Sequence, residues 1–264
     1  MRFRKLKQFS NNRAETIQSL AWSADGTLLA TGTRKGTIFV WNAGNGNLRQ
    51  KLEGHVSSVT ALAWSSDGTL ASAGKDPAIL IWDLRNGNAV CRFNGFSPFS
   101  CLTWRDTKTL VSGTKNGTLS LWSRESEAVL VHVSAHNAEV TSCHCFTVGQ
   151  KGRLLSSSID NTVNLWDDTF MERLNVFRPN FSCRRVAVDP DAGLVALHGH
   201  GPDVRIYDTN EFAPVTIVST GFERVGRVTW NGSDEFVAVG DRGVAQWFKL
   251  SDNSTTEILS LIHI

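Results

Sequence analysis

Residues 54–83 read GHVSSVTALAWSSDGTLASAGKDPAILIWD, and this stretch decides the fold. Runs of strand-forming residues at 59–64, 70–74 and 79–82 are separated by turn sequences. The first turn contains Asp67-Gly68, which supplies the positive φ that a tight hairpin needs. A fourth run follows at 89–93. The segment therefore predicts one sheet of four short antiparallel strands with two apolar faces.

The same pattern returns along the chain about every forty residues. An aromatic residue ends the third strand of each unit, and a second set of mostly aromatic residues lies about twenty residues upstream. The first set is Trp41, Trp82, Trp122, Trp166, Tyr207 and Trp247, and the second is Trp22, Trp64, Trp104, Phe146, Val188 and Trp230. Six sheets with two apolar faces each must cover one another, which predicts a β-propeller.

Two units resemble the WD40 family. Gly54-His55 begins one unit and Trp82-Asp83 ends its third strand, while His136 and Trp166-Asp167 occupy the same places two units later. The resemblance covers residues 16 to about 250 and implies an all-β, WD40-like β-propeller of four-stranded antiparallel blades, six of them encoded here. It also implies a hydrogen-bonded tetrad within a blade. The complete sets are His55, Ser72, Asp76, Trp82 and His136, Ser156, Asp160, Trp166.

We expect a single domain over residues 1–258, and the resemblance to WD40 rings makes residues 2–9 the candidate closing outer strand. Because the sixth unit already has an outer strand, we expect a native ring of seven blades and a chain that continues by about one repeat. Residues 259–264 resemble a translated sequencing adapter, and we interpret them as a scar. The expected units are about 16–54, 55–95, 96–135, 136–178, 179–221 and 222–258.

Composition and motifs exclude several classes of protein. The 264 residues carry a net charge of +2 and contain no apolar run long enough for a membrane span. The basic start lacks the apolar stretch of a secretory signal, so we expect an intracellular protein, in the cytoplasm or nucleus. The sequence contains neither G-x-S-x-G nor H-E-x-x-H, and we expect no catalysis and no cofactor.

Histidines near cysteines or near each other do not predict a metal site. In Cys143-His144-Cys145, strand alternation places His144 on the face opposite the two cysteines. His198 and His200 form a pair that we expect in an irregular, exposed loop, and two ligands do not make a site.

The turns between the second and third strands hold the candidate binding residues, because in propellers these turns line one rim. The first three units place Arg34, Lys35, Lys75 and Lys115 there. Such cations suit an acidic or phosphorylated peptide or a nucleic-acid backbone, although solvated turn residues are the simpler interpretation. Aromatic residues at the unit starts either fill the space of absent histidines or anchor an interface. These are Phe96, Phe99, Phe181 and Phe222.

Two functions remain open. The favoured one is a non-catalytic scaffold that mediates protein–protein interactions within a multi-protein complex. The alternative is an adaptor that binds RNA, phosphorylated or otherwise anionic ligands through the basic rim of the first three units. Proteins or peptides are the expected partners of the first, and nucleic acid or another anion those of the second.

Overall fold

The structure is a computed structural model that describes residues 15–258, apart from 168, 170, 171, 190, 192, 233, 241–243, 252 and 253. The predicted closing strand at 2–9 and the predicted scar at 259–264 lie outside the described residues. The described chain divides into two compact units, one up to Cys143 and one from His144 onward.

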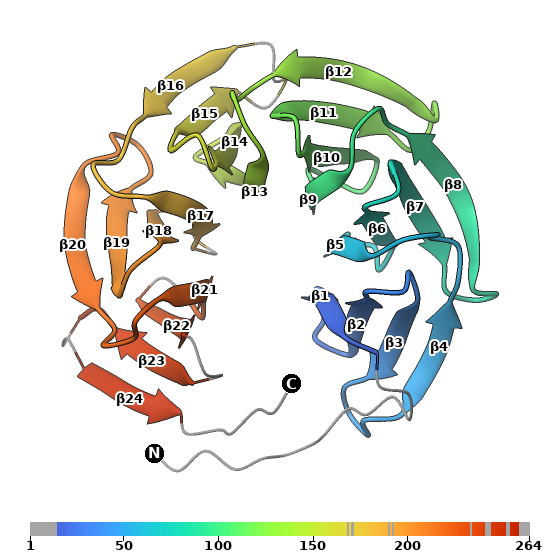
Figure 1. Ribbon diagram of the computed structural model, residues 1–264, viewed down its shortest axis with the longest axis horizontal. Coiled ribbons are helices and arrows are strands. Elements are labelled where there is room, and N and C mark those ends of the chain that lie inside the picture. Colours follow the sequence, from blue (N-terminus) through green and yellow to red (C-terminus); the bar gives the residue numbers. More distant parts are fainter. Residues whose placement is uncertain are drawn as a thin grey trace. The chain divides into compact units, whose positions relative to one another are not determined.

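The N-terminal unit contains three complete four-stranded blades (Figure 1). In each blade the strands pair with their neighbours in chain order, and every pairing is antiparallel. The strands of blade 1 are β1 (Ile17–Trp22), β2 (Leu28–Thr33), β3 (Ile38–Asn42) and β4 (Leu48–Leu52). Those of blade 2 are β5 (Val59–Trp64), β6 (Leu70–Gly74), β7 (Ala78–Asp83) and β8 (Asn88–Asn94). Those of blade 3 are β9 (Phe99–Trp104), β10 (Thr109–Thr114), β11 (Thr118–Ser123) and β12 (Ala128–Ser134).

Three further sheets follow the same plan, and the boundary between the units falls within the first strand of blade 4. Blade 4 comprises β13 (Val140–Val148), β14 (Lys151–Ser158), β15 (Val163–Asp167) and β16 (Arg173–Phe177). Blade 5 comprises β17 (Cys183–Val188), β18 (Leu194–Gly199), β19 (Asp203–Asp208) and β20 (Pro214–Ser219). Blade 6 comprises β21 (Val225–Trp230), β22 (Glu235–Gly240), β23 (Ala245–Lys249) and β24 (Ser254–Ile258).

The predicted fold class, all-β with six four-stranded antiparallel propeller blades, is confirmed. In blade 2 the strands predicted at 59–64 and 70–74 have those bounds, and the third and fourth each extend one residue further at both ends. No helix of the described chain has the length and apolar character required to cross a membrane.

The core of each unit lies between consecutive blades. Ile79, Phe93 and Trp122 belong to one buried cluster shared by blades 2 and 3. In the other unit, Ile206 and Phe236 belong to a cluster shared by blades 5 and 6. Both faces of a blade are apolar because each covers, and is covered by, the next sheet.

Indole hydrogen bonds link neighbouring blades at their first strands. Trp64 Nε1 donates to the Ala21 carbonyl over 3.0 Å, and Trp104 Nε1 donates to Ala63 over 3.1 Å. In the C-terminal unit Trp230 Nε1 donates to Ala187 over 2.9 Å. The second set of residues found in the sequence, from Trp22 to Trp230, is called the upstream ladder below. Each acceptor directly precedes the residue of this ladder in the previous blade, so the bond repeats with the sequence period. The upstream ladder therefore joins blades.

Candidate binding surface

The first predicted tetrad lies together inside blade 2. His55 Nδ1 is 2.9 Å from both carboxylate oxygens of Asp76, and His55 Nε2 is 2.8 Å from Ser72 Oγ. Trp82 Nε1 donates to the same Ser72 oxygen over 2.8 Å. Because the ionised carboxylate only accepts, the ring proton lies on Nδ1 and the Ser72 hydroxyl donates to Nε2. Burial lowers the pKa of His55 despite the opposing effect of Asp76, which favours this neutral tautomer.

Part of this arrangement recurs in other blades. Trp41 Nε1 donates to Thr31 Oγ1 over 2.9 Å, and Trp122 Nε1 donates to Ser112 Oγ over 2.8 Å. In blade 6 the acceptor for Trp247 is instead a carboxylate oxygen of Glu235, at 3.1 Å. The hydrogen bond from the indole to a hydroxyl thus occurs also in blades whose sequence lacks the tetrad histidine.

The second predicted tetrad belongs to blade 4, and its indole pair is in place. Trp166 Nε1 donates to Ser156 Oγ over 3.0 Å. Asp160 Oδ1 accepts from the backbone and the hydroxyl of Thr162, over 2.9 and 2.6 Å, and so shapes its own turn. His136 is buried in the loop that leads into β13.

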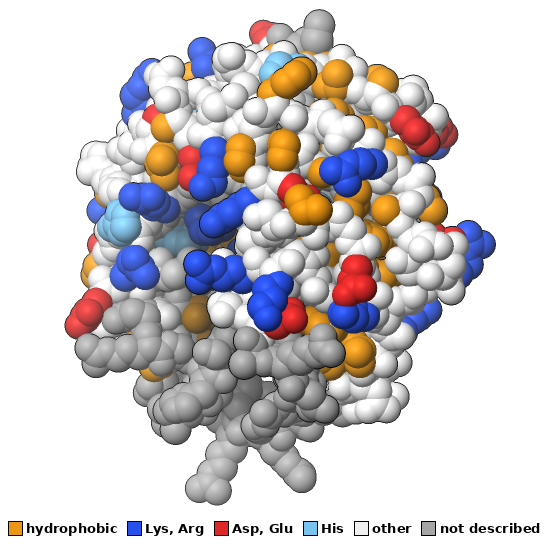
Figure 2. All heavy atoms as spheres, turned by 45° about the vertical axis from the view of Figure 1, so that its right-hand side comes forward, with side chains coloured by type: hydrophobic (Ala, Val, Ile, Leu, Met, Phe, Trp, Pro, Cys, Tyr) orange, Lys and Arg blue, Asp and Glu red, His pale blue; other side chains and the backbone are white. Residues whose placement is uncertain are grey.

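The predicted basic residues are exposed at equivalent turns of blades 1 to 3. One backbone hydrogen bond holds each turn against the loop that precedes its blade. Arg34 N donates to Thr16 O, Lys75 N to Ser58 O and Lys115 N to Pro98 O, over 2.9, 2.9 and 3.0 Å. The repeated bond fixes the backbone while the cationic side chains extend into solvent. In the view of Figure 2, Lys and Arg side chains, in blue, are interspersed with hydrophobic side chains, in orange, and acidic ones, in red.

Two large apolar side chains accompany these cations. Val56 and Phe96 are 87% and 102% exposed, although each lies in a fixed loop. Val56 N donates to Asp76 Oδ2 over 3.2 Å, and Gly95 N donates to Pro77 O over 2.8 Å. The two loops therefore flank the turn that carries Lys75.

These contacts join the three turns into one surface of the N-terminal unit. A Cβ placed on Gly36, next to Lys35, would lie 2.5 Å from the His55 carbonyl, so the first turn touches the loop of Val56. The loop of Phe96 in turn reaches Lys115 through Pro98. We call this the turn surface, defined by Arg34, Lys35, Val56, Lys75, Phe96 and Lys115. Sequence reasoning missed Val56, whose signal was an apolar residue directly after the tetrad histidine.

The other predicted aromatic residues are not equally available. Phe99 is 1% exposed and its ring meets that of Trp122 edge-on, with centroids 6.2 Å apart, so it belongs to the core. Phe181 lies beneath the Arg205 guanidinium, 4.2 Å from ring centroid to Cζ, and Phe222 packs against Gly240. Both are half-buried. Of the four phenylalanines, Phe96 alone is fully exposed.

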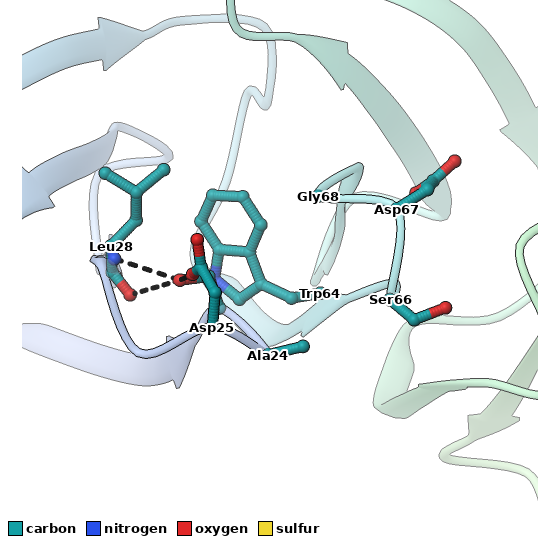
Figure 3. Close-up of a pocket in the computed structure, with 8 residues that line it drawn as sticks. Ala24, Asp25, Leu28, Trp64, Ser66, Asp67 and Gly68 are labelled. Carbon is teal, nitrogen blue, oxygen red and sulfur yellow. Dashed lines mark hydrogen bonds between the residues drawn. The ribbon is translucent and has the colours of Figure 1, made fainter.

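A small pocket lies at the turns that follow β1 and β5, away from the turn surface (Figure 3). Its volume is about 190 Å³, and Trp64, Asp25 and Asp67 line it. Ser23 Oγ and both Thr27 donors already bind the Asp25 carboxylate and lower the pKa of this group to about 2. The polar groups thus stabilise the turn, and the pocket is smaller than ligand sites usually are.

Sequence reasoning was wrong about His198. His198 lies in strand β18, where it pairs with Arg185 on one side and Val204 on the other, whereas His200 is exposed after the end of that strand. The side chain is 2% exposed. Within the described ranges, no three His, Cys, Asp or Glu side chains come together as a metal site would require.

Family models match two parts of the chain. One, described as "Anaphase-promoting complex subunit 4 WD40 domain", matches residues 2–67, and another, "WD domain, G-beta repeat", matches residues 128–167. The chain is a WD40-repeat protein. The second match ends at Trp166-Asp167, the dipeptide that carried the resemblance in the sequence of this WD40 chain.

Three similar curated proteins illustrate the range of relatives. Autophagy-related protein 16 of Arabidopsis thaliana is 27% identical over 266 residues, covering 92% of this chain and 52% of the relative. Protein FIZZY-RELATED 1 of the same plant is 31% identical, covering 70% and 40%. Small ribosomal subunit protein RACK1y of rice is 29% identical, covering 59% and 45%. The WD40 chain spans about half the length of the curated relatives it matches.

Proposed function

We propose that this WD40 chain is a non-catalytic scaffold that binds partner proteins within a multi-protein complex through its turn surface. The proposal rests on one observation: exposed Phe96 and Val56 lie among exposed cations on a backbone that repeated hydrogen bonds hold in place. Exposed aromatic anchors surrounded by charge are typical of protein interfaces. The partner surface would combine an apolar pocket for Phe96 with acidic residues.

The sequence relatives support this kind of role. RACK1y is named a ribosomal-subunit protein, which places that relative in an assembly within the cell. An intracellular place, in the cytoplasm or nucleus, is part of our proposal for this chain as well. Its complex would be identified by the proteins that the turn surface retains.

The alternative is an adaptor for RNA or other anions, which the exposed Arg34, Lys35, Lys75 and Lys115 favour. A purely electrostatic site would depend on these cations and on salt, but hardly on Val56 or Phe96. The two functions therefore make different demands on the same surface.

The test compares proteins that co-purify with the full chain and with three types of variant. The charge variant is R34E/K75E/K115E, the anchor variant is Phe96→Ala, and the controls are Arg49→Glu and Val129→Ala, which change exposed residues of the outer strands β4 and β12. We expect the first two to lose the same proteins and the controls to keep them. Retention by all variants would contradict the scaffold proposal. Loss of RNA in the charge variant, with no effect of Phe96→Ala, would favour the adaptor.

A further inference from the structure

At one position shared by the blades, the first and second strands carry a pair of facing residues whose size and charge differ between the two units. In the first three blades, the residue three before each upstream ladder position faces a small partner: Ser19 faces Gly32, Ala61 faces Ala73, and Cys101 faces Gly113. In blade 5 the equivalent pair is Arg185 and His198, and in blade 6 it is Arg227 and Val239. All five pairs follow the same irregularity in the first strand, so they occupy one structural position.

The first three blades show what the fold requires at this position. A Cβ added to Gly32 would lie 2.7 Å from Val59 Cγ1 of the next blade, and one on Gly113 would lie 2.7 Å from Val140 Cγ1. Small residues at this position thus allow the first strand of the next blade to pack closely. The packing of blades therefore does not explain why Arg185, His198 and Arg227 occupy this position in blades 5 and 6.

The positive charges of Arg185 and Arg227 act on the titratable groups around them. Burial, together with the positive charges of Arg185 and Arg227, lowers the pKa of His198 to about 4. Burial and the same two arginines also lower the pKa of His144, on β13, to about 4. Arg185 and Arg227 are exposed residues of β17 and β21. Partial burial of the guanidinium group, together with the charge of Arg185, lowers the pKa of Arg227.

His198 supplies an independent observation at the same position. Its side chain is 98% buried, since 2% is exposed, and its Nδ1 has no hydrogen-bond partner within the described chain. The ring is held against blade 6 by a hydrogen bond to the backbone of Val225. Because residues directly opposite in an antiparallel pair project to the same face, His198 and Arg185 share a face. Buried polar atoms without partners are rare and cost free energy.

We propose that Arg185, Arg227 and His198 form a binding site for a phosphate group. Two guanidinium groups offer paired N–H donors that match the oxygens of phosphate, and the anion removes their mutual repulsion. As the phosphate binds, Nδ1 of His198 takes up a proton from the solvent, and the resulting N–H donates a hydrogen bond to a phosphate oxygen. This assignment of the ligand rests on the scaffold function proposed above: the natural source of the phosphate is a phosphorylated side chain of a partner protein. Free phosphate is the other source.

The substitutions Arg185→Ala and Arg227→Ala test the site, since the equivalent residues of blades 1 to 3 are small and the variants are expected to fold. The probes are inorganic phosphate and O-phosphoserine, titrated into the full chain by calorimetry. We expect saturable binding that each substitution weakens about tenfold or more. Lys151→Ala, which removes an exposed charge at the start of β14, is the matched control and should bind as the unchanged protein does.

Thermal unfolding in phosphate-free buffer separates binding from structure. Without ligand the two arginines repel each other, so both variants should melt at or above the melting temperature of the unchanged protein. Both should also lose the increase in melting temperature that phosphate causes.

Tighter binding of phosphoserine than of inorganic phosphate supports a protein-borne ligand, and exclusion of phosphoserine overturns that source. Absence of saturable binding, equal weakening by Lys151→Ala, or a lower melting temperature in both arginine variants would overturn the site. None of these measurements depends on the turn surface, so the two proposals fail separately.

Discussion

The Ser72 hydroxyl joins two elements of blade 2 at the scale of a single residue. It accepts from the Trp82 indole and donates to His55, whose other nitrogen binds Asp76. All four side chains are buried, so water cannot replace a lost partner. In blade 3 the corresponding Ser112 serves the Trp122 indole. Within the described chain, the two blades therefore compare a hydroxyl that has two side-chain partners with one that has a single side-chain partner.

Replacement of Ser72 by alanine should destabilise the protein more than replacement of Ser112. Ser72→Ala leaves both the Trp82 donor and the His55 acceptor unpaired, which we expect to cost about 2 to 4 kcal/mol, whereas Ser112→Ala should cost about 1 to 2 kcal/mol. Equilibrium denaturation in urea measures both. Equal losses would show that the His55 bond contributes nothing to stability.

At the scale of elements, short turns and loops set the distance between blades and position the turn surface. Gly36, with φ +94°, lies where its added Cβ would meet the His55 carbonyl at 2.5 Å. Gly68, with φ +81°, forms the β5–β6 turn and has no atom within 4 Å of that place. The first glycine is needed for its φ and for close approach, and the second for its φ alone.

The two glycines should respond differently to alanine. Gly68→Ala is expected to cost about 1 kcal/mol from backbone strain. Gly36→Ala adds the displacement of a backbone carbonyl beneath the turn surface and should cost about 3 kcal/mol or more. Urea denaturation provides the numbers, and partner binding should fall for Gly36→Ala alone. Equal costs would mean that the turn can move away from the His55 loop without penalty.

At the scale of the whole molecule, the sequence period predicted the six sheets because it records which side chains are buried. Trp41 and Trp82, forty-one residues apart, are 4% and 2% exposed, and each donates to a hydroxyl ten residues before it. Side chains that make equivalent contacts in successive blades recur at one spacing, and this spacing can be recognised in the amino-acid sequence.

The binding residues were harder to predict because distant contacts decide their exposure. Phe96 lies in the loop before β9 and Phe99, three residues later, begins that strand, yet they are 102% and 1% exposed. The bond from Gly95 to Pro77 and that from Lys115 to Pro98 fix the loop between them, and neither partner is near in sequence. His198 likewise lies in a glycine-rich stretch that suggests a loop, and pairing with Arg185 keeps it in a strand.

The neutral histidine of blade 5 also makes the fold sensitive to acid. In the unfolded chain His198 titrates near 6.5, and in the folded chain near 4, so the unfolded state takes up a proton first as the pH falls. The stability that this group contributes is present above pH 6.5 and is lost between 6.5 and 4. At pH 4.5 the loss should be about 2 to 3 kcal/mol relative to pH 7, and His198→Ala should abolish that share. Denaturation at both pH values in phosphate-free buffer measures the difference, and an unchanged pH dependence in the variant would contradict it. A strand position that could have held alanine thus links the stability of the protein to the acidity of its compartment.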